Sequence, residues 1–592
     1  MSPLEVPMTE KIQDTARHWI KDPSIDTVDR QEIENLIQTN NDEELTDRFY
    51  REMEFGTGGI RGIMGVGANR MNKYNIRKAT YALGEVVKKN CQAPWRVAIC
   101  YDSRKNSFEF SKECAQVLAA LGIEAHIYPH LNPVALLSFA VRSLQAQAGI
   151  MVTASHNPPK YNGYKVYWSD GAQVTPPHDQ MIIEAYYAKK GFVHIPLISF
   201  DEGQKRGLIK WISREVEDEY FKLLQTKFVN QPLCQKYGPE LKVVYTPIHG
   251  AGKVPCLRAL GMLNMSQVVT VPEQIEPDGA FPTVKSPNPE NPEAMKLAVD
   301  LMIKTQADVA LATDPDCDRV GVALLHNGLT HYLSGNQIGI LMLNYILSNL
   351  KEQRRLPANP YFVKTIVTTP LQDTIAAKFG VQVENTLTGF KWICRRMGEI
   401  EREHPERNFV FATEESFGYM THNYVRDKDG ICSVALMAEL SLWYKLKGMN
   451  LMQALDQIYE TYGFSSEALL TLDYEGKSGA EKIKRIMERF RSQNHRTMCG
   501  QNISQAEDYK TKESTDYLTG KVKPIDLPES DVLGYCFPSG DRLYLRPSGT
   551  EPKIKFYIMV QERQGDLTAK KKKAQEKIEA FLGFVKKESE LA

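Results

Sequence analysis

Three aspartates, Asp314, Asp316 and Asp318, alternate in the segment DPDCDR, directly after an apolar, strand-like run. Alternate residues of an extended chain face the same side, so the three carboxylates should converge. Hard oxygen ligands of this kind favour magnesium or calcium over zinc. A calcium-binding EF-hand loop would need glycine and glutamate where this chain has Arg319 and Leu325. The segment is therefore either a magnesium site with room for a phosphate oxygen or a solvated acidic turn.

A hydroxyl and an imidazole are adjacent at Ser155 and His156, in the loop TASHNP after the strand-like segment AGIMV. Pro158 and Pro159 prevent helix formation and stiffen the loop. The G-x-S-x-G pattern of a hydrolase nucleophile does not fit here. On these residues alone, an ordinary turn after a strand remains an open alternative.

Two further loops carry groups suited to a sugar. The segment TEESFGY, which starts at Thr413, follows the apolar run NFVFA. Its glutamates and its serine can bond neighbouring sugar hydroxyls. Upstream, the segment TGFK places a flexible glycine beside a cation. Either segment alone could equally be a plain polar loop.

The segment RPSGTEPK begins at Arg546 and combines an arginine, two hydroxyls and a glycine whose N–H can approach an anion closely. It is not a nucleotide-binding P-loop. The Gly-Lys pair at Gly252 and Lys253 does not complete one either, because valine follows it and Pro247 stands where the first glycine should be. An anion cradle and a simple polar turn are both compatible with these residues.

Strands and helices alternate from about Trp95 onward, which is typical of βαβ units. A helix followed by glycine and then a strand recurs at Gly122, Gly261 and Gly380. A glycine just past a helix can supply its left-handed closing residue. The recurrence is compatible with three related α/β domains, although many α/β proteins show it. The first fifty residues read as amphipathic helix, with apolar residues such as Ile33 on one stripe.

The length, net charge and cysteine pattern of the chain limit its domain count and its kinds of partner. Its 592 residues suggest about four domains at roughly 150 residues each. Lys plus Arg equals Asp plus Glu at 73 each, so no net field attracts nucleic acid or anionic membrane. We find no signal peptide and no bilayer-spanning apolar run, and the ten cysteines form no CxxC pair. We expect a cytoplasmic protein with reduced thiols, no nucleic-acid partner and no membrane partner. Its oligomeric state is left open.

The loops TASHNP, DPDCDR, TEESFG and RPSGTEP occur in this order, after the segment FGTGGIRG at 55–62. This series resembles the signature motifs of the α-D-phosphohexomutase superfamily from about Glu54 to Tyr557. The resemblance implies an α/β fold with three related α/β domains and a fourth, α+β domain around a central cleft. A helical extension would span 1–53. The domains would span 54–214 with the phosphoserine loop, 215–333 with the metal loop, 334–463 with the sugar loop and 464–592 with the phosphate loop.

The resemblance also implies roles for single residues. Ser155 matches the phosphoserine, whose phosphate would complete a Mg²⁺ site with Asp314, Asp316 and Asp318. Around the transferring phosphoryl group and its protons, the matching residues are Arg61, His156, Lys165 and Arg319. Residues that match the substrate-binding loops are Thr388, Gly389, Lys391, Glu414, Ser416, Arg546, Ser548, Gly549 and Thr550.

The implied activity is interconversion of hexose 1-phosphate and hexose 6-phosphate, with glucose first and mannose second. It would proceed through a sugar 1,6-bisphosphate that is both intermediate and activator. Thr413 departs from the usual glycine of the sugar loop, and residues 131–133 depart from a family Thr-Pro. The segment 278–293 and the N-terminal extension resemble the branch of phosphopentomutases and glucose-1,6-bisphosphate synthases, which remains an alternative. A catalytically inactive sugar-phosphate sensor is the alternative outside enzymes. The polar stretch 478–530 is predicted to be a hinge before a mobile C-terminal unit.

Overall fold

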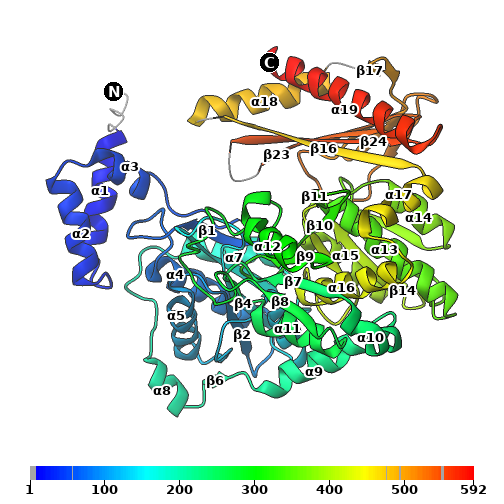
Figure 1. The fold of residues 1–592 in the computed structure, drawn as a ribbon. Helices are drawn as coiled ribbons and strands as arrows, with labels where there is room; N and C mark the ends of the chain where they lie inside the picture. Colours follow the sequence, from blue (N-terminus) through cyan, green and yellow to red (C-terminus); the bar gives the residue numbers. More distant parts are fainter. Residues whose placement is uncertain (1–7, 57, 475, 493–494, 549–551) are drawn as a thin grey trace. The chain divides into compact units, whose positions relative to one another are not determined.

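The chain forms two compact units. The computed structural model describes residues 8–56, 58–474, 476–492, 495–548 and 552–592 (Figure 1). The first unit comprises residues 1–332 and 418–439, and the second comprises 333–417 and 440–592. All ten cysteines are free, as predicted. No helix in the described part of the chain is both long and apolar enough to cross a membrane.

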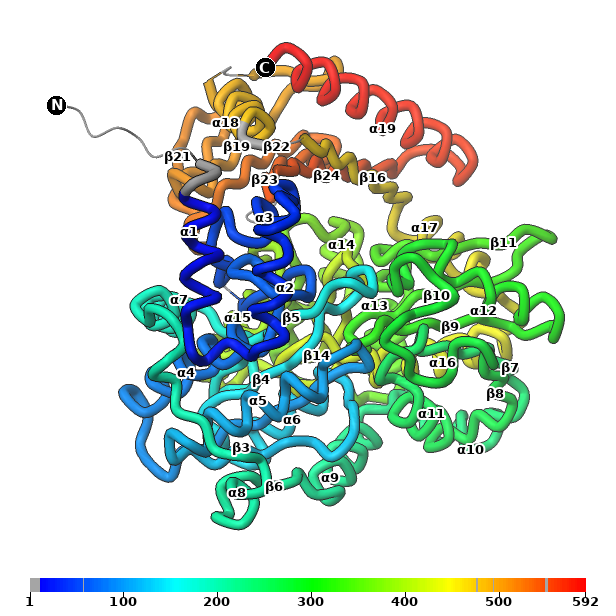
Figure 2. The backbone as a smooth tube through the Cα atoms, turned by 90° about the vertical axis from the view of Figure 1, so that its left-hand side faces the viewer, coloured from blue at the N-terminus to red at the C-terminus, as the bar shows by residue number. Residues whose placement is uncertain are grey.

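The predicted N-terminal helical region is three short helices that pack on one another (Figure 2). They are α1 (Met8–Lys21), α2 (Thr27–Gln38) and α3 (Asp42–Phe49). Ile33 is fully buried in the apolar cluster that they share, and Leu36 and Ile37 pack at its edge. A single helix does not form because polar turns interrupt it. Asn41 caps the third helix by accepting a hydrogen bond from the Glu44 N–H.

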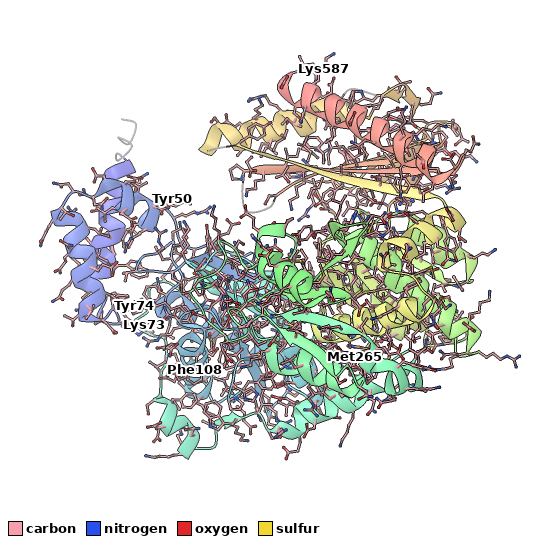
Figure 3. All side chains as sticks on the ribbon, in the orientation of Figure 1. Tyr50, Lys73, Tyr74, Phe108, Met265 and Lys587 are labelled. Atoms are coloured by element: carbon pink, nitrogen blue, oxygen red, sulfur yellow. The ribbon has the colours of Figure 1, made fainter. Side chains whose placement is uncertain are left out.

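Helix α4 (Lys73–Asn90) attaches these three helices to the rest of the first unit. The Asp26 N–H donates to the Tyr74 hydroxyl at 2.8 Å, and that hydroxyl donates to Asp29. The Trp19 ring meets the Tyr74 ring edge-on, with 5.8 Å between centroids. Figure 3 shows Lys73 and Tyr74 beside the N-terminal helices. The extension is therefore docked by packing as well as by polar contacts.

The first sheet of the first unit has the strand order β1-β5-β4-β2-β3-β6. Its strands are β1 (Gly59–Ile63), β2 (Arg96–Tyr101), β3 (Glu124–Ile127), β4 (Ala148–Val152), β5 (Tyr161–Trp168) and β6 (Ile209–Trp211). The helices of this region are α5 (Ser107–Ala120), α6 (Val134–Ser143), α7 (His178–Ala188) and α8 (Phe200–Lys205). Strands β2, β3, β4 and β6 are parallel, β5 runs antiparallel to β4, and the edge strand β1 runs antiparallel to β5.

The second sheet has the order β11-β10-β9-β7-β8. Its strands are β7 (Lys242–Thr246), β8 (Gln267–Thr270), β9 (Val309–Thr313), β10 (Val320–His326) and β11 (Leu329–Tyr332). The helices of this region are α9 (Arg214–Gln225), α10 (Gln231–Tyr237), the 3-10 turn η1 (Gly238–Glu240), α11 (Lys253–Met262) and α12 (Pro292–Thr305). Strand β7 is parallel to both of its neighbours, and β10 returns antiparallel to β9. The first unit also contains the short strand β15 (Gly418–Met420).

The third sheet lies in the second unit and contains β12 (Pro360–Thr365), β13 (Gln382–Thr386) and β14 (Asn408–Glu414). Strand β12 is central and parallel to both others. The same order, in which the first strand is flanked by the second and the third, occurs for β2, β3 and β4 and for β7, β8 and β9. This repeated order confirms the predicted series of three related α/β domains. The helices of this region are α13 (Gly335–Glu352), α14 (Leu371–Lys378), α15 (Phe390–Glu403) and α17 (Leu451–Tyr462). Helix α16 (Gly430–Leu446) begins in the first unit and ends in the second.

Two of the three predicted helix-closing glycines have the expected backbone. Gly122 follows α5 with φ of 76°, and Gly380 follows α14 with φ of 71°. The prediction for Gly261 is wrong, because this glycine lies inside the last turn of α11. Asn264 takes the left-handed conformation there instead, with φ of 57°. Asparagine tolerates this region better than most residues because its short side chain can bond locally.

The C-terminal part of the second unit is an antiparallel sheet in the order β16-β24-β23-β22-β19-β20-β21, covered on one face by two helices (Figure 1). Its strands are β16 (Phe464–Asp473), β19 (Gln505–Asp508), β20 (Glu513–Asp516), β21 (Val522–Pro524), β22 (Leu533–Cys536), β23 (Arg542–Pro547) and β24 (Lys553–Glu562). The helices are α18 (Gly476–Ser492) and α19 (Leu567–Glu590), and a separate pair is formed by β17 (Thr497–Met498) and β18 (Gln501–Asn502).

The hinge predicted for 478–530 is wrong, since the stretch contributes most of α18, the pair β17 and β18, and three strands of the sheet to this folded part. The mean composition of the stretch is polar, but its few apolar residues are spaced for one helix face. Ile486 and Phe490 are at most 1% exposed in the core beneath the sheet. Periodicity rather than average hydrophobicity decides the structure here.

Candidate active site

Asp314, Asp316 and Asp318 lie in the turn that follows β9, and each is at most 1% exposed. Ligand oxygens of the three carboxylates lie within 4.8 Å of one another. The backbone N–H groups of Asp318 and Arg319 donate to Asp314 Oδ1 at 3.0 and 3.1 Å, which fixes the turn. Oδ1 of Asp316 and Oδ1 of Asp318 are buried without a hydrogen-bond partner among the described residues. Unbonded hard oxygens that converge in this way fit a divalent cation such as Mg²⁺.

The charges around this cluster are unevenly distributed. Burial, followed by repulsion from Asp318 and Asp316, raises the pKa of Asp314 well above its usual value. Burial would also raise the pKa of Asp318, but Lys428, Lys165 and Arg319 lower it below the ordinary range. The neighbouring cations therefore compensate part of the negative charge, and a bound cation would compensate the rest.

Ser155 lies in the loop after β4 and reaches the aspartate cluster directly. Its Oγ donates a 2.9 Å hydrogen bond to Asp314 Oδ2, across 159 positions of sequence. The Ser155 backbone is left-handed, with φ of 50°, and its N–H donates to Thr153 Oγ1 at 2.8 Å. The serine loop and the metal loop, which the sequence could only relate by resemblance, are thus one site.

His156 Nδ1 lies 3.2 Å from Ser155 Oγ. Burial, together with the cations Arg319 and Arg61, lowers the pKa of His156 well below its usual value. The imidazole is therefore neutral near pH 7 and can exchange a proton with a neighbouring oxygen.

The other predicted cations are close to this site. Arg61 lies on β1 and donates to Asn157 Oδ1 at 2.8 Å. Lys165 lies on β5 and donates to Asp316 Oδ2 at 2.8 Å. Arg319 forms an ion pair with Glu290. Residues from two sheets of the first unit therefore supply the positive charge.

Sequence reasoning missed a buried arginine under the serine loop. Arg104, in the segment YDSR after β2, donates to the carbonyls of Ser155 at 2.5 Å and of Pro158 and Tyr161 at 3.0 Å. Asp102 Oδ1 accepts from the Arg104 N–H at 2.9 Å. The available signal was the position of YDSR, because β2 and β4 are parallel neighbours whose carboxyl ends share one edge.

Lys428 was also missed. Its Nζ lies 2.9 Å from Asp318 Oδ2, opposite Lys165, whose Nζ lies 3.7 Å from the same oxygen. In the sequence this lysine stands between Asp427 and Asp429, where it looks like part of an exposed charged turn. Nothing in that local pattern indicates a contact with the metal loop.

In the second unit, the TGFK and TEESFG loops meet at the ends of two strands. The Gly389 N–H, just after Thr388, donates to Glu414 Oε1 at 2.9 Å, and Gly389 has a left-handed φ of 115° that favours glycine. Ser416 lies in the turn that follows β14. The Lys391 ammonium lies 5.2 Å from the centroid of the Trp392 ring. The TGFK and TEESFG loops therefore form one polar cluster of side chains.

Glu415 adds a titratable group that the sequence did not single out. Burial and the neighbouring Glu414 raise the pKa of Glu415 to about 7. Its Oε2 accepts a 2.9 Å hydrogen bond from Thr365 Oγ1 and a longer one, 3.4 Å, from Thr368. This carboxylate is held by hydroxyls at and just beyond the end of β12.

The predicted phosphate loop is described in part. Arg546 lies on β23, opposite Lys555 of β24. The Ser548 N–H donates to the Lys553 carbonyl at 2.7 Å, which closes the hairpin end. Gly549 and Thr550 lie outside the described residues. The two basic side chains at this hairpin end suit an anion.

A repeated α/β fold whose serine hydroxyl bonds a buried aspartate cluster defines an enzyme of the phosphoryl-transfer class. Sequence models of the phosphoglucomutase/phosphomannomutase α/β/α domains I, II and III match residues 52–192, 218–327 and 334–462. A phosphoglucomutase of Staphylococcus epidermidis is 37% identical over 93% of this chain and 98% of its own length. A phosphoglucomutase of Staphylococcus aureus is 36% identical over 91% of this chain and 95% of its own length. The chain belongs to the phosphoglucomutase/phosphomannomutase family and is a phosphohexomutase-type isomerase.

Solved structures share the fold at lower sequence identity. A putative phosphomannomutase of Thermus thermophilus superposes with a TM-score of 0.63 at 21% identity, covering 88% of this chain and 99% of its own. Parafusin of Paramecium, a phosphoglucomutase in an open form, gives a TM-score of 0.67 at 17% identity, covering 91% and 96%. These similarities cover about nine-tenths of the chain and confirm the fold class.

Proposed function

We propose that this enzyme interconverts glucose 1-phosphate and glucose 6-phosphate through a phosphoryl group carried on Ser155. The observation that carries the proposal is the 2.9 Å hydrogen bond from Ser155 Oγ to Asp314 within the buried aspartate cluster. The preference for glucose is supported by the phosphoglucomutases that are 36–37% identical over more than nine-tenths of the chain.

Asp314, Asp316 and Asp318 would hold Mg²⁺, together with an oxygen of the seryl phosphate. The two Oδ1 atoms of this cluster that accept no hydrogen bond from a described residue support a cation at this position. When bound, Mg²⁺ would supply Lewis-acid stabilisation of the phosphate charge. Lys165, at 2.8 Å from Asp316, would limit the negative charge around the transferring group.

In the transfer step, the bond between Ser155 Oγ and phosphorus breaks as a sugar hydroxyl oxygen bonds the phosphorus. The proton lost by that hydroxyl returns to Ser155 Oγ, and neutral His156, 3.2 Å from Oγ, is placed to carry it. Arg61 and Arg319 would bond the phosphoryl oxygens, because guanidinium groups match their charge and geometry. The sugar bisphosphate so formed would turn over and return its other phosphate to Ser155.

The second unit would bind the sugar and the phosphate that is not being transferred. We assign sugar hydroxyls to Glu414 and Ser416, with Lys391 and the Thr388–Gly389 turn beside them. We assign the idle phosphate to Arg546 and Ser548, and by resemblance to Gly549 and Thr550. The same binding groups must accept both isomers, because the sugar reverses between the two transfers.

Ser155→Ala tests the proposal. Intact-mass measurement should find one phosphate on wild-type protein after incubation with glucose 1,6-bisphosphate and none on the variant. Turnover should fall to background, since no other described side chain bonds the aspartate cluster through a hydroxyl. Assays with glucose, mannose and ribose phosphates should rank glucose first. A wild-type protein that takes up no phosphate would be a sugar-phosphate binder instead.

A further inference from the structure

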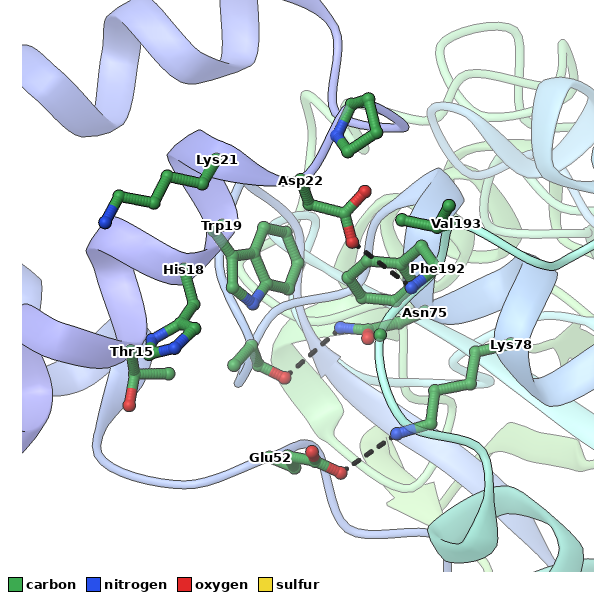
Figure 4. Close-up of a pocket in the computed structure, with 13 residues that line it drawn as sticks. Thr15, His18, Trp19, Lys21, Asp22, Glu52, Asn75, Lys78, Phe192 and Val193 are labelled. Atoms are coloured by element: carbon green, nitrogen blue, oxygen red, sulfur yellow. Dashed lines mark hydrogen bonds and ion pairs between the residues drawn. The ribbon is translucent and has the colours of Figure 1, made fainter.

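A cavity of about 490 Å³ lies in the first unit, where the N-terminal helices meet helix α4 (Figure 4). We call it the N-terminal cavity. One wall is aromatic: the Trp19 and Phe192 rings lie 5.0 Å apart at 76°, and Val193 extends this wall. The opposite wall carries Glu52 and Lys78. Helix α1, which supplies Trp19, precedes the matched family domain, which starts at residue 52.

The polar wall holds a cation whose partner can be exchanged. The Lys78 side chain is 4% exposed, and its Nζ bonds Glu52 Oε2 at 3.0 Å, whereas the Glu52 side chain is 48% exposed. The same ammonium lies 4.4 Å from the centroid of the Tyr186 ring. Because nearly half of the Glu52 side chain is exposed, water can solvate its carboxylate when another anion takes its place beside Lys78. The buried ammonium needs an anion, but that anion need not be Glu52.

The remaining charges on the lining, those of Lys21 and Asp22, balance each other. His18 and Lys21 are exposed at the edge of the cavity. Asp22 also lines it, but its carboxylate already accepts from the N–H groups of Ser24 at 2.8 Å and Phe192 at 3.3 Å. With Glu52 displaced, the lining carries two lysines and one acid, Asp22, which is already engaged in hydrogen bonds.

We propose that the N-terminal cavity binds a small aromatic anion, a planar ring bearing one phosphate or carboxylate group. The ring packs against Trp19 and Phe192, and the anionic group replaces Glu52 as the partner of Lys78. The volume suits one such molecule, because small-molecule sites start at about 300 Å³.

Displacement of Glu52 can affect the strand that carries Arg61 through the adjacent residue Met53. This regulatory step rests on the function proposed above. The adjacent Met53 N–H donates to the carbonyl of Ala68, a cavity residue, at 2.8 Å. Met53 Cε lies 2.6 Å from the position that a Cβ on Gly62 would take. Gly62 follows Arg61 on β1. Initial rates at saturating glucose phosphates, with and without phenyl phosphate, test this step: a changed turnover supports it, and unchanged rates overturn it.

The test uses phenyl phosphate as the probe, with inorganic phosphate and phenol as half-probes. Calorimetry is performed on the full chain with saturating equilibrated glucose phosphates, so that the catalytic phosphate sites are filled. Phenyl phosphate should bind at least tenfold more tightly than either half-probe. Lys78→Met should weaken its binding about tenfold to a hundredfold, through loss of a charged hydrogen bond. Lys89→Met, exposed near the end of the same helix and outside the lining, should leave the affinity unchanged.

Glu52→Gln removes the competitor and should strengthen phenyl phosphate binding several-fold. If Lys78→Met does not fold, Glu52→Gln decides, because it changes an exposed side chain. An unchanged or weaker affinity of that variant for phenyl phosphate would show that Glu52 and the probe do not compete for Lys78. Failure of phenyl phosphate to bind wild-type protein that still turns over glucose phosphates overturns this inference alone. Ser155→Ala should bind phenyl phosphate normally while losing turnover. Lys78-dependent binding to a wild-type protein without mutase activity would instead overturn the proposed function.

Discussion

Lys165 Nζ donates a 2.8 Å hydrogen bond to Asp316 Oδ2, although the lysine is on the first sheet and the aspartate follows a strand of the second. Burial would lower the pKa of Lys165, but the carboxylates of Asp316 and Asp318 raise it above its usual value. The lysine is thus a fixed positive charge that joins the two α/β domains at the metal loop. The free Oδ1 of Asp316 is left for a cation.

Asp316→Asn should reduce activity chiefly through weaker magnesium binding, because a neutral amide is a poorer ligand in a three-aspartate site. It also removes the charge that Lys165 needs. We expect activity to require a higher magnesium concentration, seen in metal titrations at fixed substrate. Magnesium affinity equal to wild type, measured by calorimetry, would show that DPDCDR is not the metal site. Asp308→Asn, before the same strand, serves as the control.

Arg104→Lys should lower kcat by at least about tenfold while changing KM little. A lysine carries the charge but lacks the planar fork that serves several carbonyls of the serine loop. Arg104→Ala should additionally destabilise the protein by roughly 3–5 kcal/mol, because Asp102 is left buried without its cation. Phosphate incorporation at Ser155 separates the two effects, since a merely destabilised protein would still be phosphorylated below its Tm. Full incorporation and full kcat in Arg104→Lys would contradict the positioning role.

Glu415 should make stability depend on pH. Its folded-state pKa of about 7 is raised above the unfolded value of 4.5, so the folded state binds the proton more tightly. Stability should therefore fall as pH rises from about 4.5 to 7, by up to about 3 kcal/mol for a shift of this size. Glu415→Gln keeps an acceptor for Thr365 and removes the titration. Thermal unfolding of both proteins between pH 5 and 8 should show a Tm difference that widens in favour of the variant, and a constant difference would contradict the pKa.

The sequence predicted the fold class because its signals are local. The strand β2, the helix α5 and the strand β3 lie where apolar runs and periodicity place them. The hinge at 478–530 was mispredicted because composition was averaged over a stretch in which Ile486 and Phe490 form one buried face. The proposed domain boundaries remain predictions, which limited proteolysis can test.

The site was predictable where a motif carries the chemistry, as in DPDCDR and TASHNP. Arg104 and Lys428 were not predicted as site residues because each contacts a residue that is distant in the sequence. Arg104 contacts Ser155 across 51 positions, and no spacing rule connects them. Such contacts depend on which strands are neighbours, and this becomes visible once the sheet order is known.

Arg546→Ala should weaken apparent substrate affinity about tenfold to a hundredfold. The arginine is proposed to hold the phosphate that is not transferred, and a charge-assisted contact of this kind contributes roughly 1.5–3 kcal/mol. Arg546→Lys should recover only part of the loss, because an ammonium lacks the planar two-point fit to phosphate. The control for a lost positive charge is Lys571→Ala, because the Lys571 side chain pairs with Asp456 on the surface. The defect should appear with both glucose 1-phosphate and glucose 6-phosphate, since each must place its idle phosphate on the same arginine. Initial rates in both directions decide the matter, and a variant impaired with one isomer alone would show that Arg546 is not a shared phosphate ligand.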